Sequence, residues 1–271
     1  GNIVFNKIEI NGLNATLDSN HTSKSPQSTQ PKVHPSSKDT PDSSSHFNFA
    51  IDSFKIDNSN LHFIQGNYQI NVTHIKAEVS ELQLNDQYFP VKLKSQANLS
   101  DSGHTLNLNL NYSGKIKLSK SFLSHQDKPS QLSSEGLISI TDIVYDAFKV
   151  DEISSNTKIE SGTISLNPLN IRLYDGRSTG SAEYQLKKQS FEIKQTATDI
   201  NAGALFASLL EKQVAEGTLD FTLNSSGSLK GKNWVKSIKA SGNASIKDGK
   251  LLFVDVDKLV NDINIQFDKL L

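Results

Sequence analysis

Histidine and cysteine are the residues that would first reveal a metal site or acid–base chemistry in this chain. The seven histidines stand at positions 21, 34, 46, 62, 74, 104 and 125, and none has the HxxxH or HExxH spacing of a zinc site. Cysteine is absent, which excludes disulfides, thiolate ligands and cysteine nucleophiles. We therefore predict no metal site and no cofactor, and we expect the histidines to be surface residues.

Carboxylates could support glycoside hydrolysis, which uses a pair of them around the scissile bond. Asp151, Glu152 and Asp199 are the candidates, but their spacing does not define a pair, and a solvated strand face explains them better. The nucleotide-binding patterns GxGxxG and GxxxxGK[ST] are both absent. We predict that the chain is not an enzyme and has no catalytic residue.

The overall charge is close to neutral, because 28 Lys and Arg residues balance 29 Asp and Glu residues. Such a chain has no general attraction for nucleic acid or for an anionic membrane surface. Apolar residues make up only 35% of the sequence, which suits a sheet with one apolar and one solvated face. The chain has no apolar run long enough to span a bilayer, and it begins with Gly1 in place of Met. We expect a C-terminally truncated fragment whose membrane anchor lies outside it.

The first half of the chain alternates apolar and polar residues with the period of a β-strand. Residues 1–18 predict N-terminal strands, interrupted at Asn11-Gly12, that join the main sheet. Residues 19–46 are rich in Ser and Pro and contain one large apolar residue, so they predict a disordered loop. The alternation then resumes, and a bulge near Asp52-Ser53 would reconcile its two parities.

The second half of the chain continues this pattern and adds a helix. The helix is predicted to begin at the N-cap residue Asn201 and to carry an apolar stripe on one face. Asp248-Gly249 predicts a tight hairpin turn after a long strand. Residues 255–271 fit either a second amphipathic helix or the start of another strand. Residues 47–271 are expected to form one elongated β-groove domain.

These patterns predict a mainly β fold, in which a long, twisted, largely antiparallel sheet curves into a groove or half-pipe with one or two short amphipathic helices. The apolar stripe of the strands fits either the core of a closed sandwich or a groove that accepts acyl chains. The groove is favoured by the low apolar content and by the small number of helices available to cover the strands. The candidate groove residues are Phe47, Phe49, Ile51, Leu61, Phe63, Leu106, Leu108, Leu110, Leu219, Phe221 and Leu223.

Several segments occur in an order that resembles the AsmA-like proteins of Gram-negative cell envelopes. They are KIEINGLNATL, FNFAIDSFKIDNSNLHFIQGNYQINVTHIKAEVSEL, YFPVKLKSQANLSD, LYDGRSTGSAEY, ATDINAGALFASLL, EGTLDFTLNSSGSL and SIKASGNASIKDGKLLFVDVDKLV. The resemblance covers nearly the whole chain. It departs from the family pattern in lacking the membrane helix and the final strands.

The resemblance implies a protein anchored in the inner membrane, with an elongated β-rich part in the periplasm. Larger relatives form sheets with a hydrophobic groove implicated in moving phospholipid toward the outer membrane. The implied function is non-catalytic binding or transfer of phospholipid acyl chains in outer-membrane biogenesis, with a lipid, a membrane and envelope proteins as partners and no nucleic acid. The alternative is a periplasmic scaffold that regulates outer-membrane protein or lipopolysaccharide assembly without binding lipid, and an enzyme such as a glycan hydrolase comes third.

Overall fold

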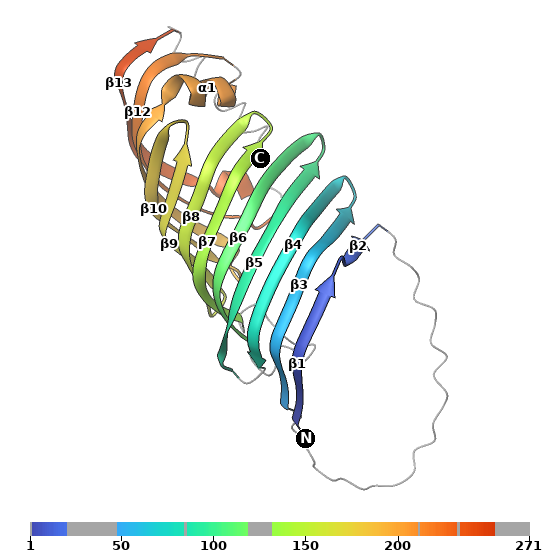
Figure 1. Cartoon of the computed structure of the whole chain (residues 1–271). Coiled ribbons are helices and arrows are strands. Elements are labelled where there is room, and N and C mark those ends of the chain that lie inside the picture. Colours follow the sequence, from blue (N-terminus) through green and yellow to red (C-terminus); the bar gives the residue numbers. More distant parts are fainter. Residues whose placement is uncertain are drawn as a thin grey trace.

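One open sheet dominates the molecule (Figure 1). The computed structural model describes residues 2–20, 48–83, 86–118, 132–210, 212–231 and 234–252. The sheet has 13 strands in the order β1-β3-β4-β5-β6-β7-β8-β9-β10-β11-β12-β13, with β2 paired to β3 outside this path. Every pair from β3 onward is antiparallel, which confirms the predicted mainly β, largely antiparallel fold.

The strands are long, and most are joined to their neighbours by short turns. Their bounds are β1 (Asn2–Asn11), β2 (Asn14–Asp18), β3 (Asn48–Gln65), β4 (Tyr68–Gln83), β5 (Tyr88–Asp101), β6 (His104–Leu118), β7 (Leu132–Tyr145), β8 (Phe148–Glu160), β9 (Thr163–Leu173), β10 (Gly176–Gln185), β11 (Ser190–Asn201), β12 (Ala215–Ser228) and β13 (Lys239–Leu251).

Two short helical segments complete the described structure, α1 (Ala202–Leu210) and the 3₁₀ helix η3 (Trp234–Ser237). Helix α1 begins where the sequence predicts, because the backbone N–H of Ala204 donates to Asn201 Oδ1 at 3.0 Å. This N-cap bond satisfies one of the amide groups that a helix start leaves unpaired. The predicted helix or strand at residues 255–271 lies outside the described residues, as does nearly all of the predicted loop at 19–46.

The first two strands run parallel to β3 and are separated by a break. β1 pairs with the first part of β3 and β2 with its later part. At the break, the backbone N–H of Gly12 donates to the Asp57 carbonyl at 3.1 Å, and that of Asn60 donates to the Leu13 carbonyl at 2.7 Å. Ser59 Oγ accepts the backbone N–H of Leu13 at 3.1 Å. These bonds hold the interrupted strand against one continuous neighbour.

The predicted bulge near Asp52-Ser53 is wrong in its position. Ile51 pairs with Leu82 and Ser53 with Ser80 without any shift in register. The register of β3 against β4 instead shifts between Ile56 and Leu61, where Asn58 adopts φ 46°. Apolar alternation predicts which side chains face inward, but it does not show which residue is the extra one in the bulge.

The predicted hairpin turn at Asp248-Gly249 is also wrong. Strand β13 continues through these residues to Leu251, and its register against β12 slips between Glu216 and Thr218. Asp248 adopts φ 49°, which a bulge and a hairpin turn can both require. The dipeptide therefore makes a bulge inside a strand that is longer than expected.

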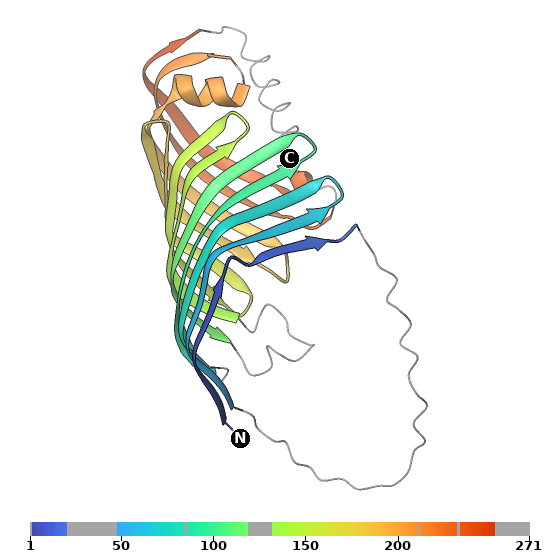
Figure 2. The same cartoon turned by 45° about the vertical axis from the view of Figure 1, so that its right-hand side comes forward.

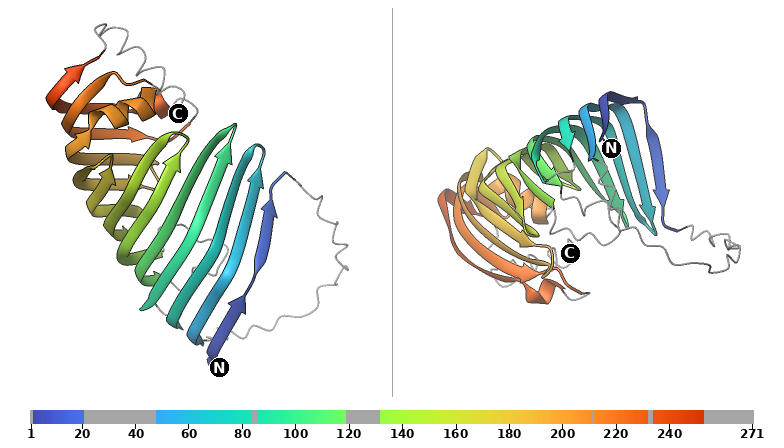
Figure 3. Two further views of the ribbon diagram at one scale, coloured as in Figure 1. Left: turned by 45° about the horizontal axis from the view of Figure 1, so that its top comes forward. Right: turned by 90° about the horizontal axis from the view of Figure 1, so that it is seen from below.

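The sheet is strongly curved (Figures 2 and 3). Glycines occupy positions where neighbouring strands approach closely. Gly114 and Gly136 face each other across β6 and β7, while Gly180 lies in β10 and Gly242 in β13. A Cβ added to any of them would lie within 3.0 Å of backbone atoms of the neighbouring strand. Real Cβ atoms essentially never approach so closely, so only glycine permits this backbone geometry.

Substituting Gly180 with Ala should destabilise the sheet by about 2 kcal/mol, because the new methyl group would overlap the Lys194 carbonyl of β11. The measurement is the free energy of unfolding from urea titration followed by circular dichroism. Ser181→Ala, at the adjacent position of the same strand, is the control and should change this free energy by less than about 0.5 kcal/mol. Equal stability of Gly180→Ala and the unsubstituted protein would contradict the role given to Gly180.

Candidate functional site

One face of the sheet is predominantly apolar, because residues opposite each other on neighbouring strands share a face. The strand register joins such residues into rows that cross the sheet. One row from β3 to β8 consists of Phe63, Ile70, Leu99, Leu106, Tyr145 and Phe148. Another row from β6 to β12 consists of Leu110, Ile140, Ile153, Ile171, Ser178, Ala197 and Phe221.

This apolar face is the concave face of the sheet. Helix α1 packs on it, forming a small core in which Ala197, Ile200, Ala202 and Leu219 are buried. Figure 2 shows α1 on the concave side at the C-terminal end of the sheet. No second sheet covers the remainder within the described ranges, and most of its inward side chains stay half-buried. The concave face is therefore the candidate functional site.

Five of the predicted groove residues lie together on the concave face of β3 and β6. Leu61 and Leu108 belong to one row, through Val72 and Ala97. Phe63 and Leu106 belong to the next row, and Leu110 follows on β6. All five are half-buried, so part of each side chain remains accessible from the groove.

The other predicted groove residues differ in their surroundings. Phe221 shares a row with Leu110, and Leu223 lies two residues further along β12 on the same face. Leu219 is only 7% exposed and packs beneath α1, so it belongs to the core of that end. Ile51 is buried opposite Leu82. Phe49 lies in β3, and Phe47 lies outside the described residues.

Tyr174 fastens α1 to the sheet. Its hydroxyl accepts a hydrogen bond from the backbone N–H of Lys149 at 3.0 Å and donates one to Ser208 Oγ of the helix at 2.5 Å. Its ring packs edge-on against Phe148, with 5.8 Å between the ring centres. The helix thus bridges from β11 and β12 to β8 and closes one end of the concave face.

The convex face is polar and carries ion pairs, some between neighbouring strands and some within a single strand. Both members of most pairs are well exposed, so each pair contributes little to stability, but together they keep this face hydrated. The pairs include Lys55–Glu78 (3.7 Å), Lys115–Glu135 (3.1 Å), Lys158–Glu160 (2.6 Å), Arg172–Glu152 (2.8 Å) and Lys194–Glu192 (2.7 Å).

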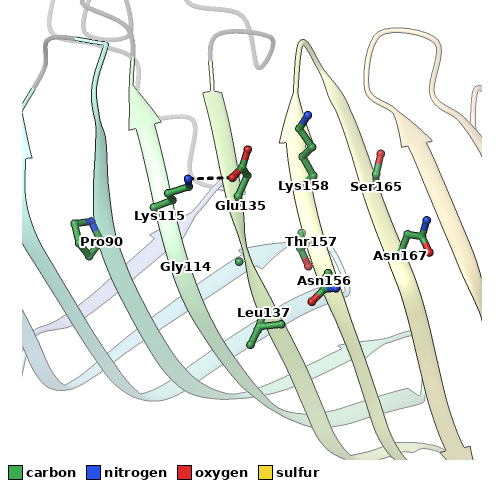
Figure 4. Close-up of a pocket in the computed structure, with 11 residues that line it drawn as sticks. Pro90, Gly114, Lys115, Glu135, Leu137, Asn156, Thr157, Lys158, Ser165 and Asn167 are labelled. Atoms are coloured by element: carbon green, nitrogen blue, oxygen red, sulfur yellow. Dashed lines mark ion pairs between the residues drawn. The ribbon is translucent and has the colours of Figure 1, made fainter.

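A shallow depression of about 820 Å³ opens on the convex face (Figure 4). The glycines Gly114 and Gly136 contribute to its lining, and the ion pair of Lys115 with Glu135 stands beside them. Leu137 also lines it and is 61% exposed, which is unusual on an otherwise polar face. The depression offers a hydrophobic contact with polar surroundings and no pair of free carboxylates.

Some of the His, Asp and Glu side chains that could take part in catalysis or metal binding instead make structural contacts. Within the described ranges, no group of three or more His, Asp or Glu side chains could hold a metal ion. His104 Nδ1 lies 2.6 Å from Asp146 Oδ2, and this hydrogen bond, with a further one from the Thr105 amide, lowers the pKa of the Asp146 carboxyl. Glu152, a predicted carboxylate candidate, pairs with Arg172.

A polar group inside the apolar face was missed by sequence reasoning. Residues 176–180 read Gly-Arg-Ser-Thr-Gly, which matches the nucleophile-elbow pattern Gly-x-Ser-x-Gly of hydrolases. They lie within strand β10, however, and not at a strand-to-helix turn. The Ser178 hydroxyl donates to Gln195 Oε1 at 2.6 Å, and an amide oxygen cannot act as a general base at neutral pH. Both side chains are buried on the concave face.

The fold and the site define a curved, single-layered sheet with an apolar concave face and a polar convex face. A family model described as the AsmA family matches residues 3–268, and the chain belongs to that family. The family is associated with the cell envelope and is not known as an enzyme family. No curated protein and no solved structure matches the chain. None of the helices in the described part of the chain is long and apolar enough to cross a membrane.

Substituting Tyr174 with Phe should release α1, because it removes the hydroxyl that links Lys149 to Ser208. We expect a loss of about 1–2 kcal/mol in unfolding free energy and faster hydrogen exchange of the α1 amides. Tyr184→Phe is the matched control, since Tyr184 also lies on the concave face and its hydroxyl has no such link to α1. Unchanged exchange of the α1 amides in Tyr174→Phe would show that the helix is held by apolar packing alone.

Proposed function

We propose that the protein is a non-catalytic lipid-binding module of the cell envelope, in which the concave face shields acyl chains from water. The observation that carries this proposal is the long, predominantly apolar lining of an open sheet, covered at one end by α1 within the described residues. An apolar surface of this extent would ordinarily promote aggregation unless something occupies it. Hydrocarbon chains are the occupant that matches a long lining without charge.

Hydrophobic shielding is enough for this activity. Each CH₂ group withdrawn from water gains about 0.8 kcal/mol, so a bound acyl chain is strongly favoured over one in water. Movement between successive apolar rows exchanges one such environment for another and needs neither a nucleophile nor a metal ion. The direction of transfer would come from a lipid gradient or from partner proteins.

Family membership supports the placement of this module in the cell envelope. We propose that it lies in the periplasm, anchored to the inner membrane, where it binds phospholipid or another acyl lipid during outer-membrane biogenesis. Neutral overall charge suits a protein that contacts lipid tails more than head groups or nucleic acid.

Photo-crosslinking in intact cells tests the proposal. A benzophenone amino acid at Leu108, which is half-buried on the concave face, should form adducts with acyl lipid. The same probe at Asn111, exposed on the convex face of the same strand, is the matched control and should form none. Lipid adducts at neither position, or equal adducts at both, would refute the proposed groove.

A second candidate function is scaffolding, in which the protein docks envelope partners without binding lipid. The exposed Leu137 in the convex depression favours it, because a lone accessible leucine with polar surroundings suits a small protein contact. The same probe at Leu137 distinguishes the two functions. Protein adducts at Leu137 without lipid adducts at Leu108 would support scaffolding over lipid binding.

A further inference from the structure

Gln195 places an unpaired hydrogen-bond donor in the apolar concave face. The residue lies in β11 and is only 7% exposed. Its Nε2 atom is buried and has no hydrogen-bond partner, a state shared in the described part of the chain only with Thr157 Oγ1. Leaving such a group unsatisfied is costly, and buried polar atoms in folded proteins nearly always have partners. We therefore expect a ligand or a water molecule to accept a hydrogen bond from this amide.

The orientation of this amide is set by Ser178. The Ser178 hydroxyl is itself buried and donates to Gln195 Oε1 at 2.6 Å. Because a hydroxyl donor selects the carbonyl end of the amide, the NH₂ end is the one left without a partner. The pair thus presents two N–H donors from a fixed position on the face.

The backbones of β10 and β11 approach each other closely beside Gln195. Gly180 is its direct cross-strand partner on β10, and the three atoms nearest to an added Cβ there are backbone atoms of Lys194 and Gln195. On the other side, Leu223 continues the same row. Two residues further along β11, Ala197 is already buried in the core beneath α1. Gln195 therefore lies beside the core beneath α1, in a row whose Leu169 and Ser155 are also buried.

The surroundings of Gln195 are polar in places but carry no charge. The other residues in its row and in the adjoining concave rows are apolar residues, glycines and residues with a hydroxyl group. None of them is Lys, Arg, Asp or Glu. A phosphate at this depth would lack a counter-charge and would lose its hydration. A neutral acceptor, such as a carbonyl oxygen, fits two amide donors without that cost.

We propose that Gln195 Nε2 donates a hydrogen bond to the acyl carbonyl oxygen of a bound lipid, where the hydrocarbon chain joins the head group. This inference rests on the proposed lipid-binding function. It makes Gln195 a specificity-determining residue that distinguishes acyl esters and amides from alkyl ethers. The acyl chain then extends along the half-buried apolar rows, and the head group lies beyond the face.

Thr157 is the other buried residue with an unpaired atom, and its setting differs. Its cross-strand partner is also a glycine, Gly136. A Cβ at Gly136 would meet the Tyr112 hydroxyl, which lies 2.5 Å from Ser134 Oγ, so an aromatic side chain already fills that space. Gln195 is therefore the residue that we assign to a ligand. Its Nε2 atom has almost no exposed surface in this structure, so a ligand reaches it when neighbouring side chains move aside.

A competition experiment with two lipids tests the proposal. The purified protein is offered equal amounts of a diester phosphatidylglycerol and its diether analogue with the same chains and head group, and bound lipid is quantified by native mass spectrometry. One hydrogen bond predicts a preference of about three- to tenfold for the diester. Gln195→Leu keeps the volume, removes the unpaired donor and should abolish the preference while the protein stays folded.

Two further variants complete the experiment. Ser178→Ala should weaken the preference, because the amide loses the bond that orients it. Gln96→Leu, the same change on the exposed convex face of β5, should retain the full preference. If the unsubstituted protein binds both lipids equally, Gln195 does not select acyl esters, and a water molecule satisfies its amide. The proposed lipid-binding function is not affected by that result. If it binds neither lipid, the proposed function fails together with this inference.

Discussion

The structure depends on one constraint, which is that apolar side chains stay on the same face from strand to strand, including where the register shifts. Side chains alternate between faces, so a slip of one residue in one strand would send its apolar set to the convex face. Short turns such as Gly66-Asn67 between β3 and β4 limit such slips. Where the register does shift, as between Ile56 and Leu61, the bulge returns the following apolar residues to the concave face.

Curvature turns this two-faced sheet into a groove. Glycines at close approaches, among them Gly114 and Gly136, allow neighbouring backbones to come nearer than any side chain would permit. Helix α1 then covers the apolar face near β11 and β12, where Ile200 and Leu219 are buried. The result is a lining that is packed beneath α1 and mostly half-buried elsewhere, with further buried residues such as Ile51, Phe89 and Leu169. The half-buried side chains leave apolar surface that a flexible ligand can contact.

The sequence was sufficient to predict the sheet, its two faces and the start of α1. Period-two alternation is imposed by the backbone itself, and an Asn before an apolar helical stripe caps the helix through its own side chain, as Asn201 does. Asp248-Gly249 was misjudged because a bulge and a hairpin turn favour the same residues at positive φ. The parallel pairing of β1 with β3 depends on contacts between distant segments, which alternation does not encode.

The candidate site was predicted only in part, for a similar reason. Leu61, Leu106 and Leu108 came from the alternation, and the structure places them on one face. Gln195 was missed because a glutamine in a strand reads as a surface residue, and its burial depends on the neighbouring Gly180 and on Ser178. Leu219 could not be separated from the groove residues, since α1 covers it only in the folded chain.

The most direct test of the central claim is an experimental structure of the protein purified under mild conditions and supplied with phospholipid. The account predicts elongated density along the concave face, in contact with the row that contains Leu61 and Leu108. Density confined to the convex face, or a concave face filled along its length by the protein's own side chains, would contradict it.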